Sequence, residues 1–302
     1  IEADEYDTAF FDKRAKFVHY RPEVLVINNL EFDHADIYSN LEEIQKQFHN
    51  LIRTMPSKGC LICPDDNKNI EQVLELGVWS EVNKFGADKK SLNYYEAITD
   101  DYSSIRFHLD NEFEEISWNL TGEYNVSNAM AALLVLNHLN FPLSSSAKAL
   151  ETFSGVSGRL DVLIDRKDLK LIDDFAHHPT AIRSTLEAVK EAYPGQRLWA
   201  VFEPRSATSK RKVFEQDFPD SFLAADRVVF AGLFAPEKIK EEDRLDPERV
   251  VGLIRQKGGN ANFIAEVDDI VAFIAENAEN GDVVLVMSSG GFGGIHQKIL
   301  DR

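Results

Sequence analysis

Several features that would place a sequence in a special class are scarce or missing here. There are two cysteines in 302 residues, which is too few for a framework of disulfides. No run approaches the roughly 18 apolar residues of a membrane span, and the first residues carry no basic-then-apolar signal pattern. Lys and Arg number 33 against 51 Asp and Glu, and the net charge of −18 argues against nucleic acid as a partner. We therefore expect a globular protein of about two domains, with no membrane span and no nucleic-acid partner.

The two cysteines, Cys60 and Cys63, form a Cys-x-x-Cys pattern that can indicate redox or metal chemistry. The surrounding run from Gly59 to Pro64 is typical of a buried strand, in which a spacing of three sends two side chains to opposite faces. Because no second pair accompanies them, a structural role is favoured. Two buried thiols suit a reducing cytoplasm, where we expect the protein to reside.

The first half of the chain mixes strand and helix patterns. Strands are predicted at 24–27 and 60–63, an amphipathic helix at 41–55 that Pro56 ends, short antiparallel strands within 82–120, and helices at 124–139 and 145–153.

The second half alternates more regularly, beginning after Ser154-Gly-Val-Ser-Gly158, where two glycines within five residues predict a domain boundary. Strands are predicted at 169–172, 198–202, 227–230, 262–264 and 283–286, with helical segments between them. This alternation is typical of α/β proteins, in which helices cover both faces of a parallel sheet.

Two polar clusters flank the first predicted strand. An acidic run containing Glu2, Asp4, Glu5 and Asp7 precedes it, and Phe32-Asp33-His34-Ala35-Asp36 follows it. Clusters at neighbouring strand ends can share one Mg²⁺, which prefers carboxylate oxygens and keeps several waters. A magnesium-nucleotide site is the functional interpretation, and a solvated acidic turn is the structural one.

The same opening resembles the Mur ligase family through Glu2-Ala-Asp-Glu-Tyr-Asp7, the apolar run, and Asn29-Leu-Glu-Phe-Asp-His34. Members are ATP-dependent enzymes that form amide bonds in bacterial cell-wall synthesis. They have a UDP-sugar domain, a central ATPase domain with a P-loop, and a C-terminal Rossmann-like domain. The P-loop pattern is absent from this sequence, which contains no Gly-Lys-Ser or Gly-Lys-Thr.

The resemblance therefore implies a C-terminal fragment of α/β class. Residues 1–155 are expected to form the C-terminal part of the central ATPase domain, a mostly parallel sheet with helices. Residues 156–302 are expected to form the Rossmann-like substrate domain. Such a fragment alone is expected to be inactive, and an alternative is a non-catalytic nucleotide-binding module.

For the first domain, the resemblance implies Glu2 and His34 as metal ligands, with His34 also catalytic and Asp4 a weaker candidate. It implies Asn29 as a substrate-binding residue. Many members carry a carbamoylated Lys at a set spacing past the motif His. Here that spacing lands on His49, and nearby Lys46 is not assumed to be modified.

Two asparagines stand three apart at the start of a predicted helix, in Gly122-Glu-Tyr-Asn125-Val-Ser-Asn128-Ala-Met-Ala-Ala132. Asn125 is a plausible N-cap, and an amide can also pair with the edge of adenine. The segment resembles the family motif His-Asn-x-x-Asn-Ala-x-Ala-Ala, whose asparagines contact the adenine, although Tyr124 stands in place of the His. The resemblance implies that Asn125 and Asn128 bind ATP.

Gly158-Arg159-Leu-Asp resembles the segment whose Arg reaches the nucleotide phosphates at the start of the C-terminal domain. The planar fork of Arg binds phosphate bidentately. The resemblance implies that Arg159 binds the nucleotide and acts in catalysis. The alternative is a surface Arg beside a linker.

The motif Asp173-Asp-Phe-Ala-His-His-Pro179 lies between a predicted strand and a predicted helix, where ligands collect in parallel sheets. The structural alternative is that the histidines cap the helix and an Asp closes the turn. The motif is nearly identical to the Asp-Asp-Tyr-Ala-His-His-Pro signature of members that use UDP-N-acetylmuramate. The resemblance implies that Asp173 and Asp174 address the ATP ribose, that His177 is catalytic beside the incoming amine, and that His178 binds substrate.

Glu203-Pro-Arg205-Ser-Ala-Thr-Ser-Lys210 follows the next strand, and the cations Arg205 and Lys210 suit a substrate carboxylate. The member that adds L-alanine has two arginines three apart at this site. Here Thr208 stands at the position of the second arginine, so a different amine is expected. The sequence Glu203-Pro-Arg205-Ser is similar to that of the cell-wall recycling member.

Gly290-Gly-Phe-Gly-Gly294-Ile-His296 permits close backbone approach or an anion at a helix start, with a tight turn as the alternative. In the recycling member the similar loop borders the peptide site, which implies Gly291 and Phe292 as substrate-binding residues.

The chemistry that the resemblance implies uses ATP and Mg²⁺ to activate the lactyl carboxylate of UDP-N-acetylmuramate as an acyl phosphate. The α-amine of L-alanyl-γ-D-glutamyl-meso-diaminopimelate, the murein tripeptide, then displaces phosphate in peptidoglycan recycling. L-alanine as the amine is the alternative.

Overall fold

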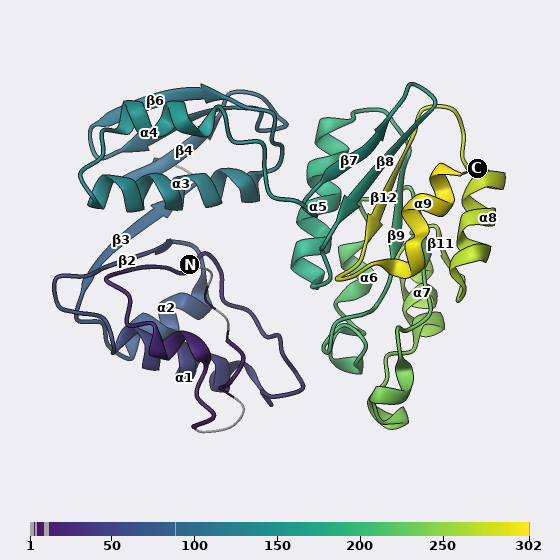
Figure 1. The fold of residues 1–302 in the computed structure, drawn as a ribbon, viewed down its shortest axis with the longest axis horizontal. Helices are drawn as coiled ribbons and strands as arrows, with labels where there is room; N and C mark the ends of the chain where they lie inside the picture. Colours follow the sequence, from purple (N-terminus) through teal and green to yellow (C-terminus); the bar gives the residue numbers. More distant parts are fainter. Residues whose placement is uncertain (1–2, 4, 9–11, 88, 302) are drawn as a thin grey trace. The chain divides into compact units, whose positions relative to one another are not determined.

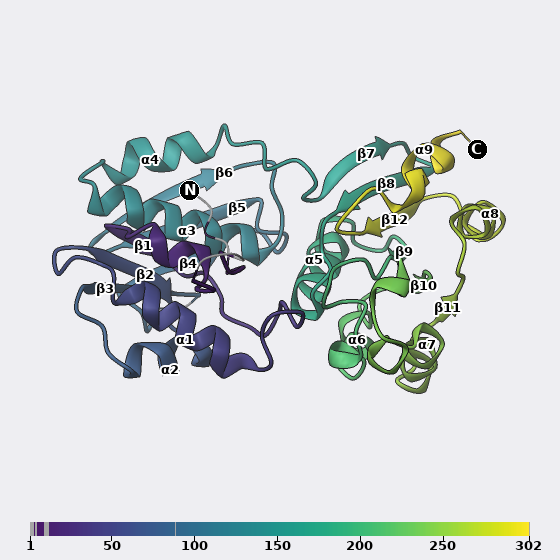
Figure 2. The same cartoon turned by 60° about the horizontal axis from the view of Figure 1, so that its bottom comes forward.

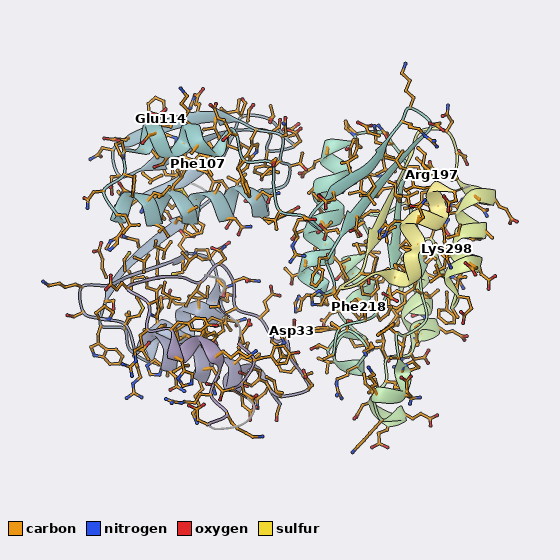
Figure 3. All side chains as sticks on the ribbon, viewed as in Figure 1. Asp33, Phe107, Glu114, Arg197, Phe218 and Lys298 are labelled. Carbon is orange, nitrogen blue, oxygen red and sulfur yellow. The ribbon has the colours of Figure 1, made fainter. Side chains whose placement is uncertain are left out.

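The computed structural model describes residues 3, 5–8, 12–87 and 89–301. It divides into two compact units, residues 1–154 and residues 155–302 (Figure 1). Figure 3 shows Phe107 inside the first unit and Phe218 inside the second, where each side chain is fully buried. In the described residues, no helix has the length and apolar character that crossing a membrane would require.

The first unit contains a six-stranded sheet in the order β1-β2-β3-β4-β5-β6. Its strands are β1 (Val24–Val26), β2 (Cys60–Pro64), β3 (Glu81–Gly86), β4 (Asn93–Ala97), β5 (Ser104–Leu109) and β6 (Glu112–Ser117). The strands from β1 to β4 pair in parallel, and β4, β5 and β6 pair antiparallel. The antiparallel strands expected within 82–120 are confirmed for β4 to β6, whereas β3 belongs to the parallel part.

Helices cover both faces of this sheet (Figure 2). The short 3-10 helix η1 (Lys16–His19), α1 (Leu41–Ile52) and α2 (Lys68–Glu75) contribute to one core, and α3 (Glu123–His138) and α4 (Leu143–Leu150) contribute to the other. Cys60 packs in the α3 core and Cys63 in the α1 core, as their spacing in a strand predicts. Both thiols are free and buried, which confirms the expectation of a buried strand.

The start of α3 differs from the expected one. Asn125 was predicted as a possible N-cap, but the helix begins at Glu123 and its N-cap is Gly122. Gly122 has a φ of 86°, a conformation that glycine adopts without the penalty of a Cβ. Asn125 therefore lies inside the first turn of α3 rather than before it.

The second unit contains a sheet in the order β11-β10-β9-β12-β8-β7. Its strands are β7 (Asp161–Asp165), β8 (Leu169–Asp174), β9 (Leu198–Phe202), β10 (Arg227–Phe230), β11 (Ala261–Phe263) and β12 (Asp282–Met287). The expected parallel sheet is confirmed, since all neighbours except β7 and β8 pair in parallel. The antiparallel edge strand β7 was not predicted.

Helices also cover both faces of the second sheet. Residues of α5 (Pro179–Ala192), α6 (Phe218–Ser221) and α7 (Pro247–Gln256) pack in one core, and residues of α8 (Val267–Asn277) and α9 (Ile295–Leu300) pack in the other. Short 3-10 helices lie in the loops: η2 (Lys212–Phe214), η3 (Pro236–Lys238), η4 (Glu241–Asp243) and η5 (Phe292–Gly294).

The strand order determines where polar side chains meet. Strand β12 lies between β8 and β9. The helices after β8 and β9 pack on one face, and the helix after β12 packs on the other. The chain therefore leaves neighbouring strands toward opposite faces at their carboxyl ends, which is where open α/β sheets bind ligands.

Candidate functional site

Polar residues from three strands gather at this edge of the second unit. We call them the strand-end cluster: Asp173 and Asp174 from β8, Glu203 and Arg205 after β9, and Ser288 and Gly290 after β12. The Ser288 hydroxyl donates to the Glu203 carboxylate at 2.6 Å and accepts from the Gly290 N–H at 3.2 Å. The Ser288 N–H donates to the Asp174 carbonyl at 3.1 Å. The three strand ends are thus joined by hydrogen bonds.

Arg205 is held on two sides within this cluster. Its guanidinium carbon lies 3.6 Å from the ring centre of Phe234, and Nη1 lies 3.4 Å from Glu203 Oε2. A Cβ at Gly290 would lie 2.2 Å from Arg205 Nε, so any larger residue there would displace the guanidinium. The cation is therefore oriented before any ligand arrives.

Lys210 lies on the same aromatic ring, with Nζ 5.8 Å from the ring centre of Phe234. Its side chain is buried, and this burial, together with the charges of Lys238, Arg205 and Arg211, lowers the pKa of its ammonium. Thr208 is 1% exposed, so in this structure its side chain does not face an open surface.

Two residues of the 173–179 motif make the contacts of the structural alternative, in which an Asp closes the turn and a histidine caps the helix. The buried carboxylate of Asp174 accepts the Leu160 N–H at 2.8 Å and the Ala176 N–H at 2.7 Å. Burial raises the pKa of Asp174, although these hydrogen bonds oppose the rise. His178 is the N-cap of α5, where Nδ1 accepts the Thr180 N–H at 3.2 Å. The first helical residue is Pro179, as predicted.

Two residues lie against the ring of Phe175, one from this motif and one from the segment before β7. The guanidinium carbon of Arg159 lies 4.8 Å from the Phe175 ring centre, and the His177 ring centre lies 5.5 Å from it. Asp173 Oδ1 lies 2.8 Å from Nε2 of His296 in α9. Arg159 and His177 are therefore brought together at the Phe175 ring within the second unit, and Asp173 lies beside α9.

The glycine-rich loop after β12 divides its residues between surface and core. Gly291 is exposed, whereas the ring of Phe292 is fully buried with residues of α8 and α9. Phe292 has a φ of 37°, and Gly293 and Gly294 also have positive φ angles, so the chain makes a tight turn here. The Phe292 side chain is thus committed to the core and is not open to a substrate in this structure.

In the first unit, His34 lies beside Glu5, with 3.5 Å between Nε2 and Oε2, and its ring contacts Tyr6. Burial alone would lower the pKa of His34, but the hydrogen bond that its ring donates to the Glu5 carboxylate and the charges of Asp33 and Asp36 outweigh burial and raise that pKa. The expected partner ligand Glu2, and Asp4, lie outside the described residues. Within the residues that are described, no three His, Cys, Asp or Glu side chains gather closely enough to hold a metal ion.

The two asparagines of α3 make different contacts. Asn125 donates to the Thr121 carbonyl at 2.8 Å, and Asn128 accepts from the Asn28 amide at 2.6 Å. Asn28 lies two residues after the end of β1, so Asn128 joins α3 to the segment that follows that strand. The Asn28 Oδ1 atom is buried and accepts no hydrogen bond from the described residues. Asn29 donates to Glu31 at 3.3 Å.

Several residues of these sites were not predicted from sequence. Glu203 and His296 stood inside motifs that were interpreted through other residues. Ser288 lay outside these motifs, and its position directly after the predicted strand at 283–286 and its neighbour Met287 was the available signal. Phe234 lies in the loop after β10, where no motif was recognised.

Comparison with known proteins now identifies the family. Residues 1–136 match the Mur ligase middle domain, and residues 158–290 match the glutamate ligase domain of Mur ligases. The chain belongs to the Mur ligase family. The expected α/β fold of the family, with two mostly parallel sheets, is confirmed by the solved structures that it resembles.

This Mur ligase chain is 41% identical over 304 residues to UDP-N-acetylmuramate–L-alanyl-γ-D-glutamyl-meso-2,6-diaminoheptandioate ligase of Haemophilus influenzae. That match covers 100% of this chain and 64% of the relative, so the chain spans less than two thirds of the relative's length. A UDP-N-acetylmuramate–L-alanine ligase of Desulfitobacterium hafniense is 29% identical over 287 residues, covering 92% of this chain and 62% of that protein. The crystal structure of a murein peptide ligase from Psychrobacter arcticus superposes with a TM-score of 0.70 and 35% identity, covering 100% of this chain and 62% of that one.

Proposed function

We propose that this chain is part of an ATP-dependent ligase that joins UDP-N-acetylmuramate to L-alanyl-γ-D-glutamyl-meso-diaminopimelate in peptidoglycan recycling in the cytoplasm. The observation that carries the proposal is the 41% identity over the whole chain with a protein named for that reaction. Identity with the L-alanine ligase is 29%, so the tripeptide is favoured over L-alanine as the amine.

Nucleotide binding is proposed for residues of both units. In the first unit, Asn125 and Asn128 are proposed to contact the adenine. The buried Oδ1 of Asn28, next to Asn128, lacks a donor among the described residues, and the amino group of adenine would supply one. In the second unit, Arg159 is proposed to bind the phosphates and Asp173 the ribose, because both side chains remain accessible. Asp174 is proposed to support the ribose site, since its carboxylate accepts the backbone N–H groups of Leu160 and Ala176 next to these residues.

Amine binding is proposed for the strand-end cluster. Arg205 has a planar fork that suits a carboxylate of the incoming peptide, and its contacts with Phe234 and Glu203 orient that fork in advance. His177 is proposed to lie beside the attacking amine, and the exposed backbone of Gly291 to border the peptide. The amine attacks the acyl carbon and phosphate leaves, a step that requires the two reactants to be held in the geometry of attack, so these residues act by placing the amine.

Mg²⁺ is proposed as the metal that neutralises charge on the ATP phosphates. The described residues supply an incomplete ligand set, since His34 is paired with Glu5 and the expected partner Glu2 is not described. His34 is therefore proposed as a ligand only together with Glu2.

Amine selectivity of a ligase that contains this chain and its upstream P-loop segment tests the proposed function. We expect ADP release and product formation, followed by mass spectrometry, with the tripeptide and UDP-N-acetylmuramate. L-alanine should support much slower turnover. Faster turnover with L-alanine than with the tripeptide would assign the chain to the sibling enzyme.

Arg205→Lys tests the proposed amine site. Lysine keeps the charge but loses the bidentate fork, so binding of the tripeptide should weaken by about 1–3 kcal/mol. The loss should appear in the KM for tripeptide and leave the KM for ATP nearly unchanged. Arg227→Lys is the matched control, because Arg227 also lies over an aromatic ring, Trp199, but at the start of β10. A raised KM for ATP in Arg205→Lys would place Arg205 in the nucleotide site.

A further inference from the structure

Phe234 carries two cations on one ring. The guanidinium carbon of Arg205 lies 3.6 Å and Nζ of Lys210 lies 5.8 Å from its centre, so the two charges are no further apart than the sum of these distances. Contacts between a cation and an aromatic face are attractive because the face of the ring is electron-rich. The ring therefore keeps two positive charges close to each other beside the strand-end cluster.

The loop that bears Phe234 is fastened to the loop that bears the cations. The Phe234 N–H donates to the Pro204 carbonyl at 3.1 Å, and the Leu245 N–H donates to the Lys210 carbonyl at 2.8 Å. These two hydrogen bonds lie on either side of η3 and η4. Phe234, Arg205 and Lys210 therefore lie on two loops that backbone hydrogen bonds hold together.

Lys210 is an unusual lysine, because it is 7% exposed and forms no ion pair with any described residue. Its charged neighbours are mostly positive: Lys238, Arg205 and Arg211, with Glu237 the only acid among them. Arg211 is already paired with Asp243, and Arg205 with Glu203. Like charges around a partly desolvated ammonium disfavour its charged form, and an anionic ligand would offset their repulsion.

We infer that Arg205, Lys210 and Phe234 form a subsite for two carboxylates of one peptide, which makes the enzyme selective for a dicarboxylic amino acid at the peptide's far end. The inference rests on the proposed function, because it names how the same amine site selects its substrate. Arg205 adjoins the strand-end cluster and takes the carboxylate nearer the reacting amine, that of the D-glutamyl residue. Lys210 takes the terminal carboxylate of the diaminopimelyl residue, and Phe234 is a positioning residue for both cations.

A comparison of two peptides tests this selectivity on the unmodified ligase. L-alanyl-γ-D-glutamyl-L-lysine lacks only the terminal carboxylate of the diaminopimelyl peptide. We expect its KM to be roughly tenfold higher, as for loss of one charge-assisted hydrogen bond, with kcat nearly unchanged. Equal KM values for the two peptides at normal turnover would overturn the inference and leave the proposed function intact. Turnover of neither peptide would overturn both.

The Lys210→Met variant tests whether Lys210 binds the terminal carboxylate of the diaminopimelyl residue. Methionine keeps a similar unbranched length and removes the charge, so the variant should raise the KM for the diaminopimelyl peptide roughly tenfold and leave that for the lysyl peptide unchanged. Lys298→Met on α9, whose lysine pairs with Asp268, is the matched control and should change neither value. An equal rise for both peptides would mean that Lys210 has only a structural role and would overturn the assignment.

Phe234 is tested by a pair of variants. Phe234→Tyr keeps an aromatic face and should retain both KM values, whereas Phe234→Leu removes the face and should raise both, because Arg205 and Lys210 lose the same support. The KM for ATP should stay constant in each. Normal KM values for both peptides in Phe234→Leu would overturn the positioning role.

Discussion

Asp174 is 3% exposed, and its two carboxylate oxygens accept the N–H groups of Leu160 and Ala176. An amide has one acceptor oxygen, so Asp174→Asn would place an NH₂ group against one of these donors. Burial raises the pKa of Asp174, so removing the negative charge offsets part of the cost of losing a hydrogen bond. We expect a net destabilisation of about 1–3 kcal/mol, since a buried donor is left without an acceptor.

Urea denaturation of the Asp174→Asn variant, followed by fluorescence and circular dichroism, measures this loss. Asp168→Asn is a suitable control, because the Asp168 side chain is 61% exposed. An unchanged free energy of unfolding in Asp174→Asn would show that the backbone contacts of Asp174 contribute little.

His34 gives the first unit a pH dependence. Its pKa is raised because Glu5, Asp33 and Asp36 outweigh the effect of burial. Folding thus favours the protonated ring, and the stability that it contributes is fully present below the unfolded pKa of about 6.5 and is lost as pH rises through the higher folded value. His34→Gln should therefore flatten the fall in stability between about pH 6 and pH 8.

Denaturation curves of the wild type and of His34→Gln across that range provide the measurement. His138→Gln, in the last turn of α3, serves as the control and should follow the wild-type profile. If His34→Gln loses as much stability as the wild type when the pH is raised, another group controls the dependence.

At the scale of elements, β2 presents two thiols to two different cores. Burial raises the pKa of Cys63 to about 11 and also raises that of Cys60. Because the thiolate is the reactive form, iodoacetamide should modify both cysteines at least about a hundredfold more slowly in the native protein than in urea. Mass spectrometry of timed samples shows the extent of modification, and rapid native labelling of either cysteine would favour a redox or metal role.

Elements whose apolar residues recur at a regular spacing were predictable from the sequence. Elements in which buried and exposed side chains follow no regular order were not. The apolar spacing of α1 and α5 located both helices, although α1 ends at Ile52, before Pro56. Strand β7 lacks a clean alternation, because Val162 and Leu163 are both exposed and its pairing with β8 contains an irregularity. The start of α3 was misplaced because Gly122, whose backbone conformation rather than side chain caps the helix, gives a weaker signal than Asn125.

At the scale of the whole molecule, the sequence predicted two α/β units and the residues that follow their strands. It could not predict that β12 lies between β8 and β9, because strand order depends on contacts between distant segments. That order brings Ser288 to Glu203 and Gly290 to Arg205. The role of Phe234 could not be predicted either, because its contact with Arg205 depends on how the loop after β10 folds.

The chain alone lacks the motif that holds the phosphates of ATP in this family. The sequence contains no Gly-x-x-x-x-Gly-Lys-Ser/Thr pattern, whose backbone N–H groups and lysine cradle the phosphates that are transferred. The purified 302-residue chain should therefore release no ADP above background, even with both substrates present. A ligase in which a segment with a P-loop precedes the chain should release ADP when UDP-N-acetylmuramate and tripeptide are added. Titration of ATP against the chain separates binding from turnover. ADP release by the chain that depends on both substrates would show that its own residues suffice for phosphoryl transfer.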